Sequence, residues 1–168
     1  LAEVVACFPV YRTYVTAVEV SDKDVRYIRS AVAAAKWRSP AADTSIFDFV
    51  SEVLLTSIAE GHDPAYWSAV TTFAMKFQQF SGPVMAKGLE DTAFYRYHRL
   101  VSLNEVGSDL HRFATTAPEF HLANQDRLRC WPHTMLTTST HDSKRAADVR
   151  ARINVLSELS GLWRIRVR

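Results

Sequence analysis

Cysteine and glycine are scarce in this chain of 168 residues, and neither sign of charge dominates it. Its two cysteines, Cys7 and Cys130, lie far apart and outside any C-x-x-C arrangement, so we expect free thiols in a reducing compartment. The five glycines form no glycine-rich phosphate loop. The net charge of +2 shows no large basic excess, and only the short end WRIRVR is clearly basic. We therefore expect no nucleic-acid partner.

Long apolar runs are absent as well. No stretch approaches the roughly 20 apolar residues of a membrane span, and the first residues lack a charged signal-peptide leader, so we expect no membrane partner. The chain has 48% hydrophobic and 23% charged residues, which is typical of a globular domain with its own core. It begins without methionine and has apolar segments at both ends, which predicts a piece of a longer protein.

The pattern of apolar residues predicts a mainly helical body with a few short strands. Helices are expected after the Ser21 cap at residues 22–38, at 45–61, at 64–82, on both sides of Pro118, and at 143–163. The dipeptide Gly82-Pro83 is expected to bend the chain after the third helix. Strand-like segments are residues 3–16, which Pro9 interrupts, a stretch near residue 84, and residues 133–138.

The segment TTSTHDSKR, residues 137–145, places His141 and Asp142 between the last strand candidate and a helix. Functional residues of (β/α)8 barrels lie at the carboxyl ends of strands, so this position suits an active-site pair. The alternative is that Asp142 or Ser143 only caps the helix and that His141 is an ordinary loop residue. Spacing alone favours the helix cap.

A second segment, residues 86–107, is crowded with aromatic and charged side chains. They are Lys87, Glu90, Asp91, Tyr95, Arg96, Tyr97 and His98, followed by Asn104 and Glu105. Sugar sites use this mixture, because aromatic faces cover C–H surfaces while carboxylates, amides and guanidinium groups bind hydroxyls. A buried polar network that joins two subdomains would have the same composition, so both interpretations stay open.

Other kinds of chemistry lack support in the sequence. The histidines show neither an H-E-x-x-H motif nor His/Cys ligand spacing, so no metal site is expected. A serine or cysteine nucleophile would need a context such as G-x-S-x-G, which does not occur.

Three blocks together resemble the maltooligosyl trehalose synthase family of the α-amylase-like glycoside hydrolase clan (family 13). They are CFPVYRTYV (7–15), FQQFSGPVMAKGLEDTAFYRYHRLVSLNEVGSD (77–109) and MLTTSTHDSKRAADVRARI (135–153). The resemblance implies a multi-helix domain inserted in a (β/α)8 barrel and cut out together with a late part of that barrel. Its parts would be a barrel strand segment at 1–16, an inserted helical domain at 17–82 and a return to the barrel at 83–168. Leu110, where the family tends to have proline, is a departure.

The resemblance also implies a function. The family uses no cofactor and converts the reducing-end α-1,4 bond of a maltooligosaccharide into an α,α-1,1 bond by retaining intramolecular transglucosylation. Asp142 would be a catalytic carboxylate that favours the distorted transition state, and His141 would bind the same sugar ring. Lys144 and Arg145 would line the reducing-end subsites. Further substrate-binding candidates are Lys87, Glu90, Asp91, Tyr95, Arg96, Tyr97, Asn104 and Glu105.

The family's nucleophile and acid precede this segment, and no G-x-R-x-D motif occurs here. The resemblance implies that the full protein is a cytoplasmic isomerase. Because the nucleophile and the acid would lie outside this chain, we expect the isolated chain to be inactive. Unpaired strand edges and uncovered apolar faces predict that the isolated chain repacks or associates with itself. The alternative function is a non-catalytic helical module that binds carbohydrate or another protein.

Overall fold

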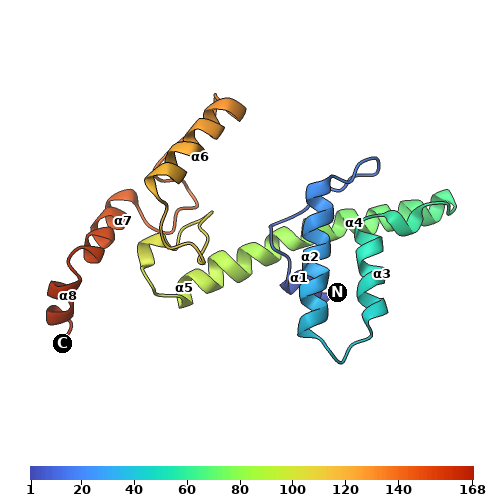
Figure 1. The fold of residues 1–168 in the computed structure, drawn as a ribbon, viewed down its shortest axis with the longest axis horizontal. Coiled ribbons are helices and arrows are strands. Elements are labelled where there is room, and N and C mark those ends of the chain that lie inside the picture. Colours follow the sequence, from blue (N-terminus) through green and yellow to red (C-terminus); the bar gives the residue numbers. More distant parts are fainter. The chain divides into compact units, whose positions relative to one another are not determined.

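The computed structural model describes all 168 residues, and every regular element in it is helical (Figure 1). The α-helices are α1 (Ala2–Ala6), α2 (Asp22–Arg38), α3 (Thr44–Leu54), α4 (Pro64–Met85), α5 (Phe94–Arg96), α6 (Ala117–Cys130), α7 (Ala147–Asn154) and α8 (Ser160–Arg166). The shorter 3-10 helices are η1 (Ser57–Ala59), η3 (Val101–Leu103) and η4 (Val155–Ser157), and η2 (Ala86–Ala93) is a π-helix. The chain forms two compact units, Leu1–Leu89 and Glu90–Arg168.

Helix starts in the first unit follow the caps that the sequence contains. Ser21 caps α2 as predicted, because its side-chain oxygen accepts a hydrogen bond from the backbone N–H of Asp24. Asp43 caps α3, and Asp63 caps α4 with Pro64 at the first helical position. These side chains satisfy N–H groups that the first helical turn leaves without partners. The same backbone hydrogen bonds lower the pKa of the Asp43 and Asp63 carboxyls.

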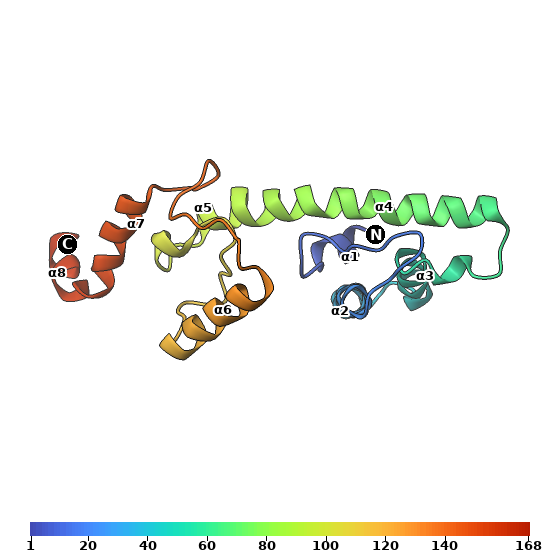
Figure 2. The ribbon, with the colours of Figure 1, turned by 90° about the horizontal axis from the view of Figure 1, so that it is seen from above.

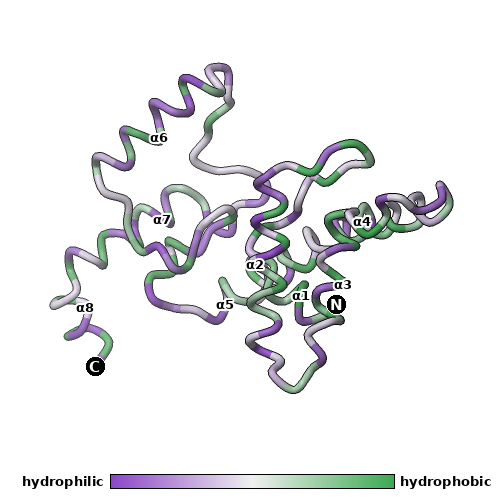
Figure 3. The backbone as a smooth tube through the Cα atoms, turned by 45° about the vertical axis from the view of Figure 1, so that its right-hand side comes forward, coloured by the Kyte–Doolittle hydropathy of each residue, from purple (hydrophilic) through white to green (hydrophobic).

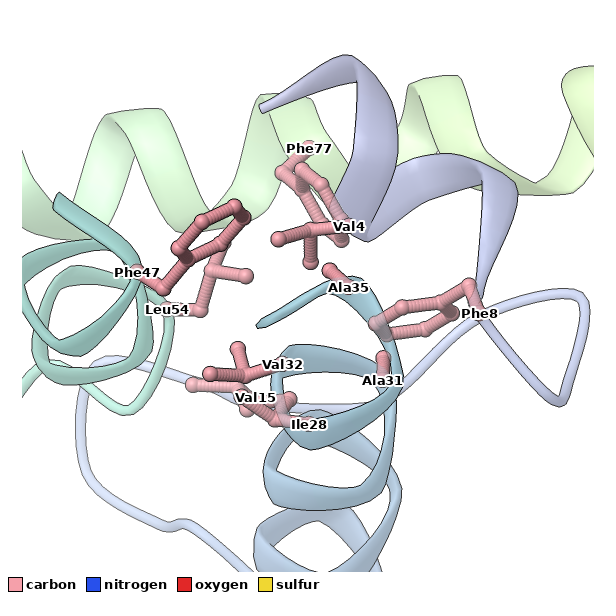
Figure 4. Close-up of a cluster of buried hydrophobic side chains, with 10 residues drawn as sticks. All are labelled: Val4, Phe8, Val15, Ile28, Ala31, Val32, Ala35, Phe47, Leu54 and Phe77. Carbon is pink, nitrogen blue, oxygen red and sulfur yellow. The ribbon is translucent and has the colours of Figure 1, made fainter. Parts of the chain in front are cut away.

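The core of the first unit lies where α1, α2 and α3 gather along one side of α4 (Figures 2 and 4). Its buried side chains are Val4, Phe8, Val15, Ile28, Ala31, Val32, Ala35, Phe47, Leu54 and Phe77. The rings of Phe8 and Phe77 meet edge to face, with centroids 5.2 Å apart. Such aromatic pairs contribute beyond the area that they bury, so the segment just after α1 is held against α4 at this point.

No strand forms in either unit, so the strand predictions are wrong. In the first candidate, residues 2–6 form α1 and the chain that follows is irregular. Side chains of α4 supply hydrogen bonds that a neighbouring strand would have supplied. Gln78 accepts from Val15 N–H at 2.7 Å and donates to Val15 C=O at 2.9 Å, and the Ser81 hydroxyl donates to Tyr11 C=O at 2.8 Å. A strand needs a second strand to pair with, and here a helix takes that place.

The other two strand candidates fail for different reasons. Near residue 84 helix α4 continues through Gly82-Pro83 to Met85, so the predicted bend is wrong too. The hydrogen bond that Pro83 removes lies near the helix end, where the wider π-helix η2 takes over. Residues 133–138 are irregular, and Met135 and Leu136 in this segment are exposed because no neighbouring strand covers them.

In the second unit, α6 begins at a capping box formed by Thr116 and Glu119, with Pro118 in its first turn. Pro118 therefore starts one helix and does not separate two. Hydrophilic and hydrophobic positions alternate along α6 (Figure 3), and none of its residues is buried. The helix predicted at 143–163 begins later, at Ala147, and is split into α7, η4 and α8. The predicted segment boundaries at residues 16 and 82 stay predictions. None of the helices combines the length and apolar character that crossing a membrane requires.

Candidate functional site

The two unusual motifs of the sequence meet in the second unit, and Glu105 is the centre of their contact. Its side chain is buried, with 9% exposure for the residue. One carboxylate oxygen accepts from the backbone N–H of Lys144 at 2.5 Å and of Val106 at 3.1 Å, and the other accepts from Arg145 N–H at 3.2 Å. The carboxylate therefore joins two segments 39 residues apart, and both of its oxygens are occupied by protein groups.

The charge of Glu105 suits this position. Burial raises the pKa of the carboxyl, but the N–H groups of Lys144, Val106 and Arg145, together with the positive charge of Arg150, lower the pKa overall. The ionised group has acceptor sites only, which is what three converging N–H donors require. Glu105 is therefore an anionic anchor for residues 144–145.

The side chains of Lys144 and Arg145 also point into the protein. Lys144 Nζ lies 3.0 Å from Asp91 Oδ1, and this hydrogen bond raises the pKa of Lys144. Arg145 Nη1 donates to the carbonyl oxygens of Val101 at 3.3 Å and Asn104 at 3.4 Å. Both basic groups thus attach their loop, residues 138–145, to the segment that precedes Glu105.

Asn104 organises the turn after α5. It is 2% exposed, and its Nδ2 donates to the carbonyl oxygens of Phe94 at 3.0 Å and Tyr97 at 2.5 Å. The rings of Tyr95 and Tyr97 remain exposed, and the Lys144 ammonium group lies 5.7 Å from the centre of the Tyr95 ring. Asn104 is therefore a structural residue, whereas the tyrosine rings are free to face a ligand.

At the tip of the attached loop, His141 and Asp142 face solvent. His141 Nδ1 lies 3.2 Å from Asp142 Oδ1, and their side chains are 101% and 76% exposed. These two side chains are therefore open to a ligand, while the residues just after them are anchored.

The helix-cap interpretation of Asp142 and Ser143 is wrong, because α7 starts at Ala147 and its N-cap residue makes no side-chain hydrogen bond. Ser139 Oγ accepts from Ala147 N–H at 3.1 Å instead. Ser143 Oγ accepts from Thr140 N–H at 2.8 Å and so closes the loop on itself.

The remaining candidates are distributed over η2 and α5. Lys87 lies in the first unit, and the other predicted site residues lie in the second. Glu90 and Asp91 belong to the π-helix η2, a type of turn that is frequent at functional sites. Arg96 is exposed on α5. No three His, Cys, Asp or Glu side chains are placed to hold a metal ion together.

Arg150 was not predicted from the sequence. Its guanidinium donates to Thr138 C=O and, at 3.4 Å, to Ser139 Oγ, so it anchors the upstream arm of the loop. The sequence carried no signal for Arg150, because the helix was predicted from residue 143 and Arg150 then lies in its interior.

The pair His141–Asp142 lies on an open surface. The second unit contains a cavity of about 590 Å³, but neither residue lines it. It is bordered instead by residues of η3, α7 and α8, with Trp163 and Phe113 among them. The His–Asp pair therefore lies outside this cavity and is exposed to solvent.

Comparisons with known proteins agree with one another, although no protein-family profile matches the chain. The structure of maltooligosyltrehalose synthase from Arthrobacter ramosus matches with a TM-score of 0.77 and 40% identity, over 96% of this chain and 19% of that one. A hypothetical maltooligosyl trehalose synthase from Sulfolobus tokodaii matches with a TM-score of 0.65 and 33% identity, over 98% of this chain and 19% of that one.

A curated protein of Mycobacterium tuberculosis (strain H37Rv), which bears the provisional name maltooligosyl trehalose synthase, is 47% identical over 112 residues. That match covers 67% of this chain and 14% of the relative. The helical fold therefore recurs as a part of much longer carbohydrate synthases. The chain belongs to the maltooligosyl trehalose synthase family, which confirms the resemblance found in its sequence.

Proposed function

We propose that this chain is part of a maltooligosyl trehalose synthase and contributes His141 and Asp142 to its glucan site. The match to synthases at 40% identity over 96% of the chain carries the proposal. The whole protein would be a cytoplasmic isomerase, a (1→4)-α-D-glucan 1-α-D-glucosylmutase. It would convert the reducing-end α-1,4 bond of a maltooligosaccharide into an α,α-1,1 bond with retention, without a cofactor.

The exposed carboxylate of Asp142 fits a role in the transition state. The reacting ring develops positive charge there, and an anion held close to it stabilises the transition state more than the neutral ground state. Only such differential binding accelerates the reaction. His141 supports this arrangement, since Nδ1 faces Asp142 at 3.2 Å and, when it carries the proton, leaves Nε2 as an acceptor for a sugar hydroxyl.

The nucleophile and the acid would come from elsewhere in the synthase. A retaining mechanism needs two carboxyl groups about 5 Å apart across the scissile bond. Of the acids that contact residues 144–145, Glu105 is occupied by three backbone N–H groups, and Asp91 Oδ1 is paired with the ammonium group of Lys144. Glu105 is therefore not available for proton transfer or attack, which supports inactivity of the isolated chain.

The test is a chimera of the Arthrobacter ramosus synthase in which this chain replaces the matching segment. The chimera should convert maltopentaose into a non-reducing product. Asp142→Asn should lower kcat by about 10²- to 10⁴-fold, because the isosteric amide removes the anion. Asp148→Asn is the matched control, since Asp148 is exposed on α7, and it should retain activity.

Three results would count against the proposal in different ways. Full activity of the Asp142→Asn chimera would remove Asp142 from the reaction, and glucan binding without any effect of Asp142 on turnover would favour a carbohydrate-binding module. Turnover of maltopentaose by the isolated chain would show that the essential carboxylates are within it. Self-association of the isolated chain stays a prediction, which light scattering would test.

A further inference from the structure

We infer that Glu105 is a positioning residue that holds the His141–Asp142 loop in its sugar-facing orientation. This inference rests on the proposed function, because it assigns Glu105 a role in that reaction through Asp142. It also changes the role expected from the sequence, which was direct contact with substrate.

The geometry points to Glu105 because it holds the loop by its backbone. The N–H groups that it binds belong to Lys144 and Arg145, the second and third residues after Asp142. Fixing two consecutive peptide groups so close to Asp142 restricts the directions in which its carboxylate can point. A bond to a long side chain would leave more freedom, because side-chain torsions could absorb a shift of the loop.

The upstream arm of the loop is held independently. Arg150 binds Thr138 C=O, and Ser143 Oγ accepts from Thr140 N–H at 2.8 Å. Both arms are therefore anchored, and the tip that remains consists of His141 and Asp142. A short tip between two anchors is an arrangement that preorganises a catalytic group, because the orientation is set before substrate arrives.

A carboxylate is required at position 105 for a simple reason. Three N–H donors converge on two oxygens, and the glutamate presents acceptors only. In Glu105→Gln the side chain keeps its size, but its NH₂ group would face at least one backbone N–H. One donor would be left buried without an acceptor, and the loop would move to relieve it.

The first arm of the experiment uses the Arthrobacter ramosus chimera and measures amide hydrogen exchange in the segment that this chain supplies. In Glu105→Gln the protection of the Lys144 and Arg145 amides should fall about tenfold to a hundredfold, with protection in α2 unchanged. Glu158→Gln removes the same charge from an exposed position of the same unit and should change nothing. Glu105→Asp retains the charge but is one methylene shorter, so the protection of the Lys144 and Arg145 amides should lie between the values for Glu105→Gln and Glu158→Gln.

The second arm uses the Arthrobacter ramosus chimera. Glu105→Gln should lower kcat about tenfold to a hundredfold while KM changes less than threefold, since a misdirected Asp142 weakens transition-state binding more than substrate binding. Combining it with Asp142→Asn should add no further loss, because both act on one carboxylate.

The outcomes separate this inference from the proposed function. An active chimera in which Asp142→Asn is inactive and Glu105→Gln is normal would overturn the inference alone. An inactive parent chimera would count against the proposed function, and unchanged exchange at Lys144 and Arg145 in the chimera would overturn the inference whatever its turnover. Global unfolding of both Glu105 variants would also overturn it, in favour of a purely structural role.

Discussion

Replacing the buried Gln78 of α4 with methionine should destabilise the first unit. Gln78 is 3% exposed and satisfies both backbone groups of Val15, which is 2% exposed. Methionine fills a similar volume, so little of the effect would come from a cavity. It leaves one N–H and one C=O buried without partners, at about 1–3 kcal/mol each, so we expect a loss of about 2–6 kcal/mol in unfolding free energy.

The neighbouring glutamine provides the control. Gln79 follows Gln78 on the same helix but is exposed, so Gln79→Met should change the free energy by less than about 0.5 kcal/mol. Both variants carry the same side-chain change at adjacent positions. Their difference therefore isolates the hydrogen bonds to Val15 from helix propensity and added hydrophobicity.

The assay has to report on the first unit alone, because two compact units need not unfold together. Hydrogen exchange at the buried α2 positions Ala31 and Ala35 follows opening of that core in the native chain. Urea unfolding followed by circular dichroism provides the free energy of the whole chain for comparison. If the unfolding free energies of Gln78→Met and Gln79→Met agree within about 0.5 kcal/mol, the buried backbone groups of Val15 do not depend on Gln78. The account of how α4 replaces a neighbouring strand is then refuted.

Two other predictions concern the second unit. Thr116→Ala removes the cap of α6, a helix without buried residues. We expect this helix to lose about 1 kcal/mol of local stability, which should appear as faster amide exchange over 118–130 but not in α7. Glu105 has a lowered pKa in the folded chain. Its contribution to stability is therefore complete above the ordinary glutamate pKa of about 4.3 and is lost as the pH falls through the lower pKa of the folded state. The stability difference between the chain and Glu105→Gln should therefore shrink on acidification through that range, and a pH-independent difference in urea unfolding would contradict this.

Local signals predicted the helices well where a cap and an apolar face coincide. The Ser21 cap and Pro64 mark the starts of α2 and α4 correctly, because the groups that satisfy a first turn are close in sequence. The absence of strands could not be predicted in this way. The many β-branched and aromatic residues at 3–16 indicate an extended segment. Only a partner decides whether such a segment forms a strand, and here the partner is α4.

The candidate site could not be predicted in full either, because it depends on contacts between residues far apart in the sequence. Composition marked the region around Glu105 and the region around Asp142 as unusual, and the structure brings Glu105 to the loop that follows Asp142. A sugar site and a buried polar network contain the same residue types, so composition could not separate them. What separates them is which donors each acceptor meets, and that depends on contacts between residues 39 positions apart.

The two interpretations of the crowded segment are complementary. A buried carboxylate needs donors around it, and Glu105 obtains them from the backbone of the loop, so the free energy that stabilises this charge also orders the loop. Asp142 meets the opposite demand, since a carboxylate that binds a sugar has to keep its acceptors open until the ligand arrives. The chain meets both demands with two acids, because Glu105 binds the backbone of the loop and Asp142 is exposed at the tip of that loop. Exchanging their environments would abolish the site: a solvated Glu105 would release the loop, and an Asp142 bound by backbone N–H groups would have no acceptor left for substrate.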